Sequence, residues 1–199
     1  LRVVMKHYDC SRNIPRVISG AWGHIFEEAM QQWESAVDLG AKFGYRNAQV
    51  TVIAPTGTIS FLMGADTTGI EPMLGVVVYK KIVGEGLLKL PNNVVAPALR
   101  NLGYKEEAIE EILTYVRDHG AIHGAPYLTE AHGQVFAEAL GPNALKPEAH
   151  VDMMAAVQPF LSGGISKTVN MPADCTPDDI AEIYICLLYT SPSPRDAHE

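Results

Sequence analysis

The sequence predicts an α/β fold with mostly parallel strands. Short segments of β-branched, apolar residues alternate along the chain with longer segments that have the three- and four-residue apolar spacing of helices. The composition, with 47% hydrophobic and 19% charged residues, is that of a globular domain. The 199 residues are enough for one domain or one lobe of a larger one, and no internal repeat is visible.

The first half of the chain predicts a long helix followed by a strand. Residues 1–20 read as irregular, because the stretch YDCSRNIP is rich in turn-forming residues. Residues 21–43 predict a helix whose apolar stripe begins at Trp22 and packs in the core, and Gly44 suits its end. The next predicted elements are a strand over residues 49–54, a short helix from residues 57–60 and a loop over residues 64–72.

The second half predicts further strands and helices in alternation. Residues 76–79 are apolar and β-branched or aromatic, which indicates a second buried strand. Residues 105–119 have the clearest helical spacing, and Gly120 marks the end of this helix. The remaining predicted elements are a helix over residues 147–159, a strand over residues 168–171 and a helix that Thr176 caps.

The stretch PTGTIS lies between the first predicted strand and a predicted helix, where parallel sheets bind ligands. Its residues are Pro55, Thr56, Gly57, Thr58, Ile59 and Ser60. The first N–H groups of a helix have no partner within it and attract anions, glycine permits close approach, and hydroxyl groups add donors. The stretch therefore predicts a phosphate-binding loop. The alternative is an ordinary junction whose hydroxyl groups only cap the helix.

Other motifs give weaker signals. The stretch GGISKT contains Lys-Thr, but Ser166 stands where a P-loop has glycine. His119 and His123 are four residues apart, yet Gly120 interrupts the helix that would align them, so no metal site is predicted. Glu71 is either an acid near a ligand or a loop anchor.

Charge and cysteine usage limit the partners. The net charge of −8 repels polyanions, so we expect no nucleic-acid partner. No apolar segment approaches the roughly 20 residues of a membrane span, and no signal peptide is visible. Three scattered cysteines without a CxxC motif indicate a reduced, cytoplasmic setting.

Two long stretches carry a family resemblance. Residues 44–72, GYRNAQVTVIAPTGTISFLMGADTTGIEP, resemble the substrate phosphate-binding segment of the ribonucleotide reductase large chain. Residues 150–184 contain QPFLSGGISKT and VNMP and resemble the following part of the same barrel. The combination is most similar to the adenosylcobalamin-dependent class, and the similarity extends from about Trp22 to Tyr184. Only this reading explains why both stretches occur together.

The resemblance implies a fold and a reaction. The fold is a ten-stranded α/β barrel, of which this chain is the C-terminal half, and residues 55–60 bind the substrate's phosphates. Homolysis of the cobalt–carbon bond of adenosylcobalamin leads to a cysteine thiyl radical, which takes the ribose 3′ hydrogen. The 2′-hydroxyl leaves as water. The implied partners of the full-length enzyme are a ribonucleotide, with a leaning toward diphosphates, and a thiol reductant such as thioredoxin; a homodimer is left open.

This chain lacks the catalytic part of that family pattern. The family's Asn-x-Cys-x-Glu loop does not occur here, and we expect it before Leu1. Cys10, Cys175 and Cys186 do not match its positions, so no catalytic residue is assigned in this chain. We expect the chain to be an inactive fragment, with a starting residue other than Met as a further indication.

We expect two segments: a barrel portion over residues 1–184 and a non-native tail over residues 185–199. Pro192 and Pro194 end any regular structure, and LLYTSPSPRD resembles translated sequencing-adapter read-through. Two alternatives to the reductase remain. The chain is a stand-alone α/β phosphate-binding module without redox chemistry, or its PTGTIS loop is merely structural.

Overall fold

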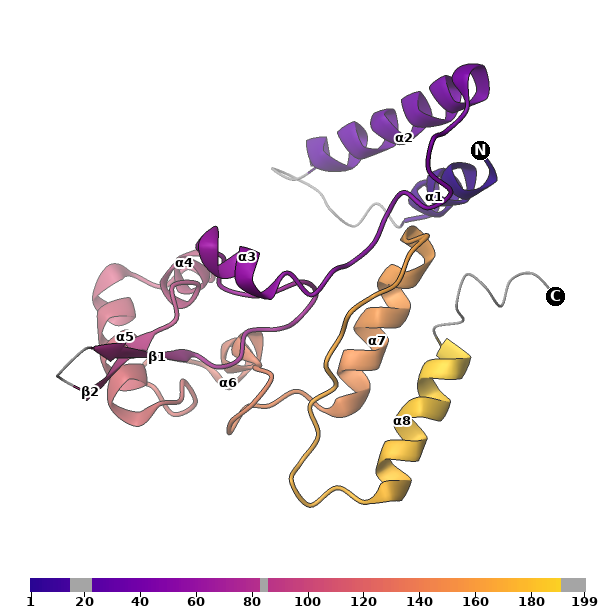
Figure 1. Cartoon of the computed structure of the whole chain (residues 1–199). Coiled ribbons are helices and arrows are strands. Elements are labelled where there is room, and N and C mark those ends of the chain that lie inside the picture. Colours follow the sequence, from indigo (N-terminus) through magenta and orange to yellow (C-terminus); the bar gives the residue numbers. More distant parts are fainter. Residues whose placement is uncertain (15–22, 83–85, 191–199) are drawn as a thin grey trace. The chain divides into compact units, whose positions relative to one another are not determined.

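The structure is a computed structural model that describes residues 1–14, 23–82 and 86–190 (Figure 1). The chain divides into two compact units. The first contains Leu1–Ala54, Val151–Ser166 and the chain from Thr176 onward, and the second contains Pro55–His150 and Lys167–Cys175. None of the helices in the described part of the chain combines the length and apolar character needed to cross a membrane.

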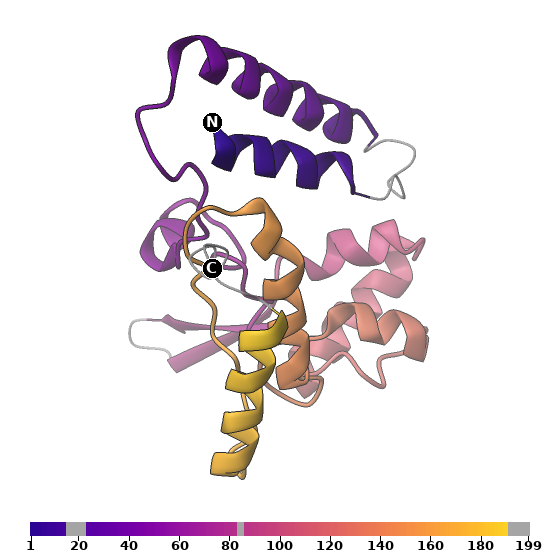
Figure 2. The same ribbon diagram turned by 90° about the vertical axis from the view of Figure 1, so that its right-hand side faces the viewer.

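The first unit begins with a helix that the sequence analysis missed. Helix α1 (Arg2–Arg12) packs against helix α2 (Figure 2). Its buried residues, Val4, His7 and Ser11, follow one another at helical steps of three and four. The prediction of irregular structure was therefore wrong over this helix, and residues 15–20 lie outside the described residues.

The long helix is confirmed as α2 (Gly23–Phe43). The predicted first positions, including Trp22, lie outside the described residues. Gly44 follows the helix with a φ of 76° and donates its N–H to a carbonyl of the last turn. The stripe packs on α1, where the Trp33 ring lies 5.3 Å from the ring of His7, but most of its side chains stay half-buried or exposed.

The strand predicted over residues 49–54 is reduced to a short parallel pairing. Ile53 forms an isolated bridge with Ile165, and its N–H and C=O bond to the backbone on either side of that residue. Val50 and Val52 are 43% and 63% exposed, so this segment is not the buried strand that its β-branched residues indicated.

Two helices complete the C-terminal part. The helix predicted over residues 147–159 is confirmed as α7 (Pro147–Val157), which a short 3-10 turn, η3 (Gln158–Phe160), extends. Helix α8 (Pro177–Thr190) begins as predicted. Thr176 accepts from the Asp179 N–H, and the Asp179 carboxylate accepts from the Thr176 N–H and hydroxyl group. Pro192 and Pro194 lie outside the described residues.

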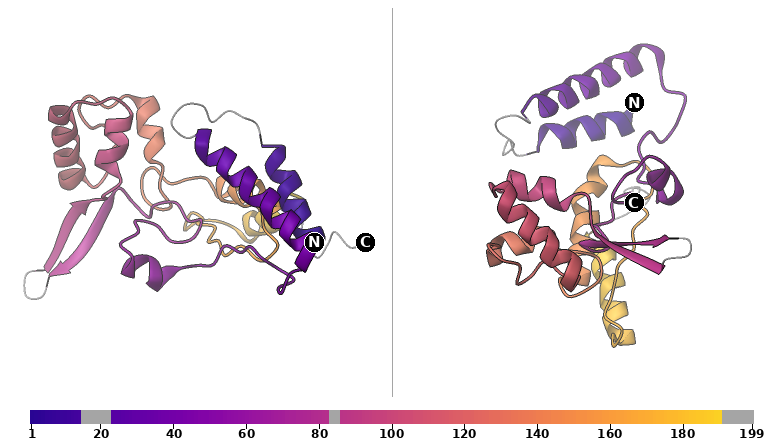
Figure 3. Two further views of the ribbon diagram at one scale, coloured as in Figure 1. Left: turned by 90° about the horizontal axis from the view of Figure 1, so that it is seen from above. Right: turned by 90° about the vertical axis from the view of Figure 1, so that its left-hand side faces the viewer.

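The sheet of the second unit is an antiparallel ribbon rather than a parallel sheet. Strand β1 (Val77–Ile82) pairs with β2 (Gly86–Pro91) in a two-stranded ribbon (Figure 3). In its register, Val77 lies opposite Pro91. Val76 is buried just before β1, but Val78 and Tyr79 are 39% and 61% exposed, so the predicted buried strand is a half-exposed one.

The prediction of mostly parallel strands is not confirmed. In the described ranges, parallel pairing is limited to two isolated bridges, and residues 168–171 form no strand. Mixed helix and strand content fits the α/β class, whereas the described part of the chain contains one two-stranded sheet and not a ten-stranded barrel.

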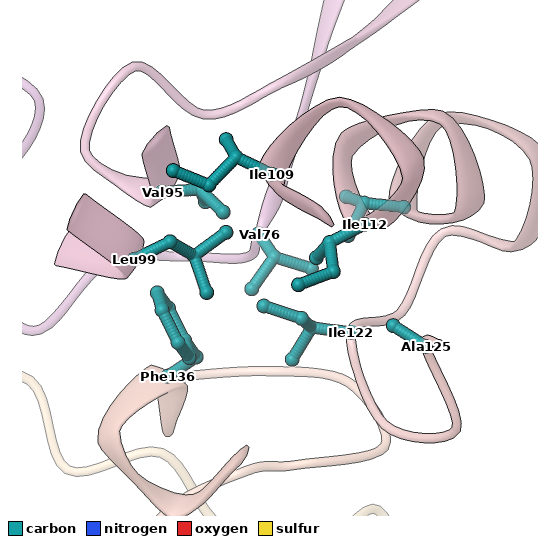
Figure 4. Close-up of a cluster of buried hydrophobic side chains, with 9 residues drawn as sticks. Val76, Val95, Leu99, Ile109, Ile112, Ile122, Ala125 and Phe136 are labelled. Carbon is teal, nitrogen blue, oxygen red and sulfur yellow. The ribbon is translucent and has the colours of Figure 1, made fainter. Parts of the chain in front are cut away.

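Helices build the core of the second unit. Helix α4 (Val95–Asn101) packs against α5 (Glu106–His119), which confirms the predicted helix, and Gly120 ends α5 with a φ of 77°. The short α6 (Glu130–Gly133) and η2 (Gln134–Phe136) follow. Figure 4 shows the buried cluster, which consists of Val76, Val95, Leu99, Ile109, Ile112, Val116, Ile122, Ala125 and Phe136.

Candidate functional site

A cavity of about 640 Å³ lies within the second unit. Its volume is in the range of about 300–1,000 Å³ that small-molecule sites have. The polar and charged lining residues that bear on function are Asp66, Thr67, Thr68, Glu71, Asn92, Thr168 and Asn170. Gly57 and Phe61 from helix α3 (Gly57–Leu62) also line the cavity.

The PTGTIS loop enters α3 through a strained residue. Thr56 has φ 47° and ψ 31°, a left-handed conformation that is unfavourable for a β-branched side chain. Its hydroxyl oxygen accepts the Gly69 N–H at 2.8 Å and the Ser60 hydroxyl at 3.1 Å. These contacts hold the loop against the following one and give a reason for the strained backbone.

The start of α3 presents backbone donors. The first hydrogen bond of the helix runs from the Ser60 N–H to the Thr56 carbonyl at 2.9 Å. The N–H groups of Gly57, Thr58 and Ile59 precede it, so they have no acceptor within the helix. Space at Gly57 is open, because a Cβ there would meet no atom within 4 Å.

The six predicted site residues have different surroundings. Gly57 is the one of them that lines the cavity. Pro55, Thr58 and Ile59 are exposed. The Ser60 hydroxyl group donates a hydrogen bond to the Thr56 hydroxyl oxygen, so these two groups mainly stabilise the loop rather than project from it.

Three charged or polar side chains meet beside the cavity. The Lys167 ammonium group lies 2.6 Å from Glu71 Oε2 and 2.7 Å from His150 Nδ1, and it also donates to the Thr168 carbonyl. Glu71 Oε1 accepts the Thr168 N–H at 2.6 Å. The Lys167 side chain is 1% exposed and that of Glu71 is 20% exposed, so the ion pair is largely withdrawn from water.

Burial lowers the pKa of His150 from its ordinary value. The positive charge of Lys167 acts in the same direction, and the negative charge of Glu71 partly opposes both. Because Nδ1 accepts from an ammonium group, the neutral ring must carry its proton on Nε2. Nε2 is buried and has no hydrogen-bond partner within the described ranges of the chain.

Sequence reasoning assigned neither Lys167 nor His150 to a site. Glu71 was noted as either an acid near a ligand or a loop anchor, and the structure shows it bonded across to Lys167 and Thr168 while it lines the cavity. Glu71 and Lys167 are 96 residues apart, so no local pattern links them. The remaining signal was the GGISKT stretch, which was considered only as a P-loop.

The other sequence candidates do not form a site. His119 stacks on Tyr115 with ring centroids 3.9 Å apart. No group of three or more His, Cys, Asp or Glu side chains within residues 1–14, 23–82 and 86–190 is arranged to hold a metal ion. Cys10, Cys175 and Cys186 are unpaired and do not line the cavity.

Comparisons with known proteins agree on one family. A family model described as "Ribonucleotide reductase, barrel domain" matches residues 3–187. The "Vitamin B12-dependent ribonucleotide reductase" of Rhodopirellula baltica is 48% identical over 188 residues, which cover 92% of this chain and 18% of that protein. The protein of the same name from Streptantibioticus cattleyicolor is 44% identical over 183 residues, which cover 92% of this chain and 30% of that protein.

A less similar relative has a more specific name. The "Vitamin B12-dependent ribonucleoside-diphosphate reductase" of Mycobacterium tuberculosis is 41% identical over 141 residues, which cover 70% of this chain and 19% of that protein. The chain therefore spans less than a third of the length of these three relatives.

Proposed function

Because the chain belongs to the ribonucleotide reductase barrel domain family, we propose that it is part of an adenosylcobalamin-dependent enzyme that reduces ribonucleotides to 2′-deoxyribonucleotides. The reaction belongs to a longer protein, because the chain spans less than a third of its relatives. The role of this portion is to bind the substrate. A diphosphate substrate is supported by the name of the mycobacterial relative.

The observation that carries the binding role is the set of free N–H groups at the start of α3. Those of Gly57, Thr58 and Ile59 lack a helical acceptor, and Gly57 borders the cavity. Phosphate oxygens accept several such bonds at once. The chain has a net charge of −8, so these local donors, rather than the overall field, must capture the anion.

The charge of the cavity orients the ligand. Asp66 and Glu71 place carboxylates in the wall, where Lys167 balances the charge of Glu71, and a carboxylate repels phosphate. Thr168 and Asn170 supply neutral donors and acceptors in the same wall, whereas the buried Asn92 side chain is bonded to the backbone of Gly75 and Val94. We therefore place the phosphates at Gly57 and the uncharged part of the nucleotide toward the amide and hydroxyl groups.

The cofactor does not fit this cavity. A volume of about 640 Å³ suits a nucleotide. Adenosylcobalamin, with its corrin ring and two nucleoside-containing axial groups, is far larger. We therefore assign the cofactor to the longer protein and no step of its chemistry to residues of this chain.

The reductant and the compartment follow from the proposed reaction. Replacing the 2′-hydroxyl by hydrogen, with loss of water, consumes two electrons and two protons. A dithiol protein such as thioredoxin supplies both as it becomes a disulfide. Such a reductant works in a reducing compartment, so we propose a cytoplasmic location.

An activity assay tests the proposed reaction. The full-length protein is incubated with a dithiol reductant and each ribonucleoside diphosphate, with and without adenosylcobalamin, and the deoxyribonucleotide is quantified. We expect product only with the cofactor. Equal product without the cofactor, or no product from any ribonucleotide, would contradict the proposal.

A further inference from the structure

The Lys167 ammonium group is fully used by its neighbours. Its three N–H donors have three acceptors: Glu71 Oε2, His150 Nδ1 and the Thr168 carbonyl. The Lys167 side chain and the residue His150 are each 1% exposed, so neither exchanges its partner for water. A buried charge with all donors satisfied has one favourable position, which makes this ammonium group a fixed point in the second unit.

Glu71 connects the Lys167 ammonium group to the cavity wall. One carboxylate oxygen binds the Lys167 ammonium group, and the other accepts the Thr168 N–H. Glu71 belongs to the loop after α3, whereas Thr168 belongs to a segment almost a hundred positions later, and both line the cavity. The carboxylate thus fastens two separate walls of the cavity to each other.

We propose that His150 and Lys167 are positioning residues, which hold Glu71 and Thr168 in the geometry that the cavity needs to bind its ligand. Neither residue lines the cavity, so Lys167 acts through Glu71 and Thr168, and His150 acts through Lys167. The required group on His150 is an unprotonated acceptor at Nδ1. The inference rests on the proposed function only for the identity of the ligand, a ribonucleoside diphosphate.

A pair of variants separates the acceptor from the bulk of the ring. His150→Asn keeps an oxygen acceptor close to the position of Nδ1, whereas His150→Phe keeps a ring and removes the acceptor. We expect His150→Phe to raise the KM for a ribonucleoside diphosphate roughly tenfold, with kcat within about twofold, in the full-length protein. His150→Asn is expected to restore the wild-type KM.

Hydrogen–deuterium exchange supplies a readout that needs no ligand. Peptides that contain residues 67–74 and 167–170 are followed by mass spectrometry in the ligand-free, full-length protein. We expect faster exchange in both peptides for His150→Phe, because the bonds through Glu71 loosen, and wild-type exchange for His150→Asn. Equal behaviour of the two variants, whether normal or impaired, would overturn the proposal.

A double variant keeps the proposal testable if a His150 variant does not fold. Lys167→Met with Glu71→Gln replaces the buried ion pair by neutral groups of similar size, an exchange that proteins often tolerate. We expect this double variant to fold and to show both faster exchange and a raised KM. Wild-type values for both would overturn the proposal. If the wild-type protein binds no ribonucleotide, the proposed function fails, while the exchange comparison still decides the role of His150 and Lys167.

Discussion

Thr56 and Thr58 lie two residues apart in the same loop, yet their hydroxyl groups have different tasks. The Thr56 hydroxyl accepts two hydrogen bonds within the protein, whereas the exposed Thr58 hydroxyl has no bonding partner among the residues that the structure describes. We expect Thr56→Val to lower the free energy of unfolding by about 1–3 kcal/mol. Val is β-branched like Thr, so the backbone strain stays the same, but Val has no hydroxyl group and leaves the Gly69 N–H unpaired. Urea denaturation measures this.

Thr58→Val should instead affect binding. The lost hydroxyl costs about 1 kcal/mol of binding free energy, or roughly a fivefold higher Kd for a ribonucleoside diphosphate, and stability should not change. Calorimetric titration and urea denaturation of the full-length protein measure the two effects. Loss of stability without loss of affinity would mean that this hydroxyl group faces the protein rather than the ligand.

Gly57 gives a steric test of the same loop. A valine side chain there meets no protein atom within 4 Å of its Cβ, so the variant should fold normally. It would project where we place the phosphate, so we expect at least a roughly tenfold rise in KM. Gly164→Val is a matched control, because this glycine is equally open and does not line the cavity. An unchanged KM for Gly57→Val would remove the loop from the binding site.

His150 predicts a pH dependence of stability. The ordinary histidine pKa of 6.5 applies in the unfolded chain, whereas burial and then Lys167 lower the pKa in the folded protein. Below about pH 6.5 the unfolded state therefore binds a proton that the folded state does not. The free energy of unfolding should fall as pH drops from 6.5 toward the folded pKa, by up to about 1.4 kcal/mol per pH unit.

The variant His150→Asn isolates this contribution. His7 in the first unit also has a lowered pKa, mainly through burial, so the wild-type slope contains both histidines. Urea denaturation over this pH range should give a shallower slope for the Asn variant. Identical slopes would show that His150 titrates normally in the folded protein.

At the residue scale, the sequence allowed local chemistry to be predicted but not the pairing of residues far apart in the chain. A glycine between hydroxyl residues after an apolar segment indicated the loop, and α3 begins there. The contact of Glu71 with Lys167 depends on how distant parts of the chain meet, which no spacing rule contains. The hydrogen bond from the Ser60 hydroxyl to the Thr56 hydroxyl likewise depends on the left-handed backbone of Thr56, which could not be predicted from the sequence.

At the scale of elements, long amphipathic helices were predictable and strands were not. Helices α2, α5, α7 and α8 have apolar spacing, proline starts or glycine ends that act locally. Helix α1 was missed because its turn-forming residues outweighed the spacing of Val4, His7 and Ser11. Residues 50–53, three of which are apolar and β-branched, form a single bridge, because strand formation depends on a partner elsewhere in the chain.

Helix α5 gives the stability test for the second unit. Ile112 is fully buried in the core cluster, so Ile112→Ala should lower the free energy of unfolding by about 2–5 kcal/mol. The exposed neighbour Thr114 is the control, and Thr114→Ala should stay within about 0.5 kcal/mol. Urea denaturation measures both. Equal losses would mean that α5 does not pack as Figure 4 shows.

At the scale of the whole molecule, the family could be recognised while the barrel could not be seen. The described residues contain one two-stranded sheet, in a chain that spans less than a third of its relatives. Helix α3 leaves Phe61, Leu62 and Met63 at least 75% exposed. Sequence motifs persist in a portion of a protein, whereas a closed sheet needs all of its strands.

The most direct measurement is a structure of the full-length protein with a bound ribonucleoside diphosphate. We predict phosphate oxygens within hydrogen-bonding distance, roughly 2.7–3.2 Å, of the N–H groups of Gly57, Thr58 and Ile59. The uncharged part of the nucleotide should extend toward Thr168 and Asn170. Phosphates bound elsewhere, with these three N–H groups facing solvent, would contradict the assignment of this loop.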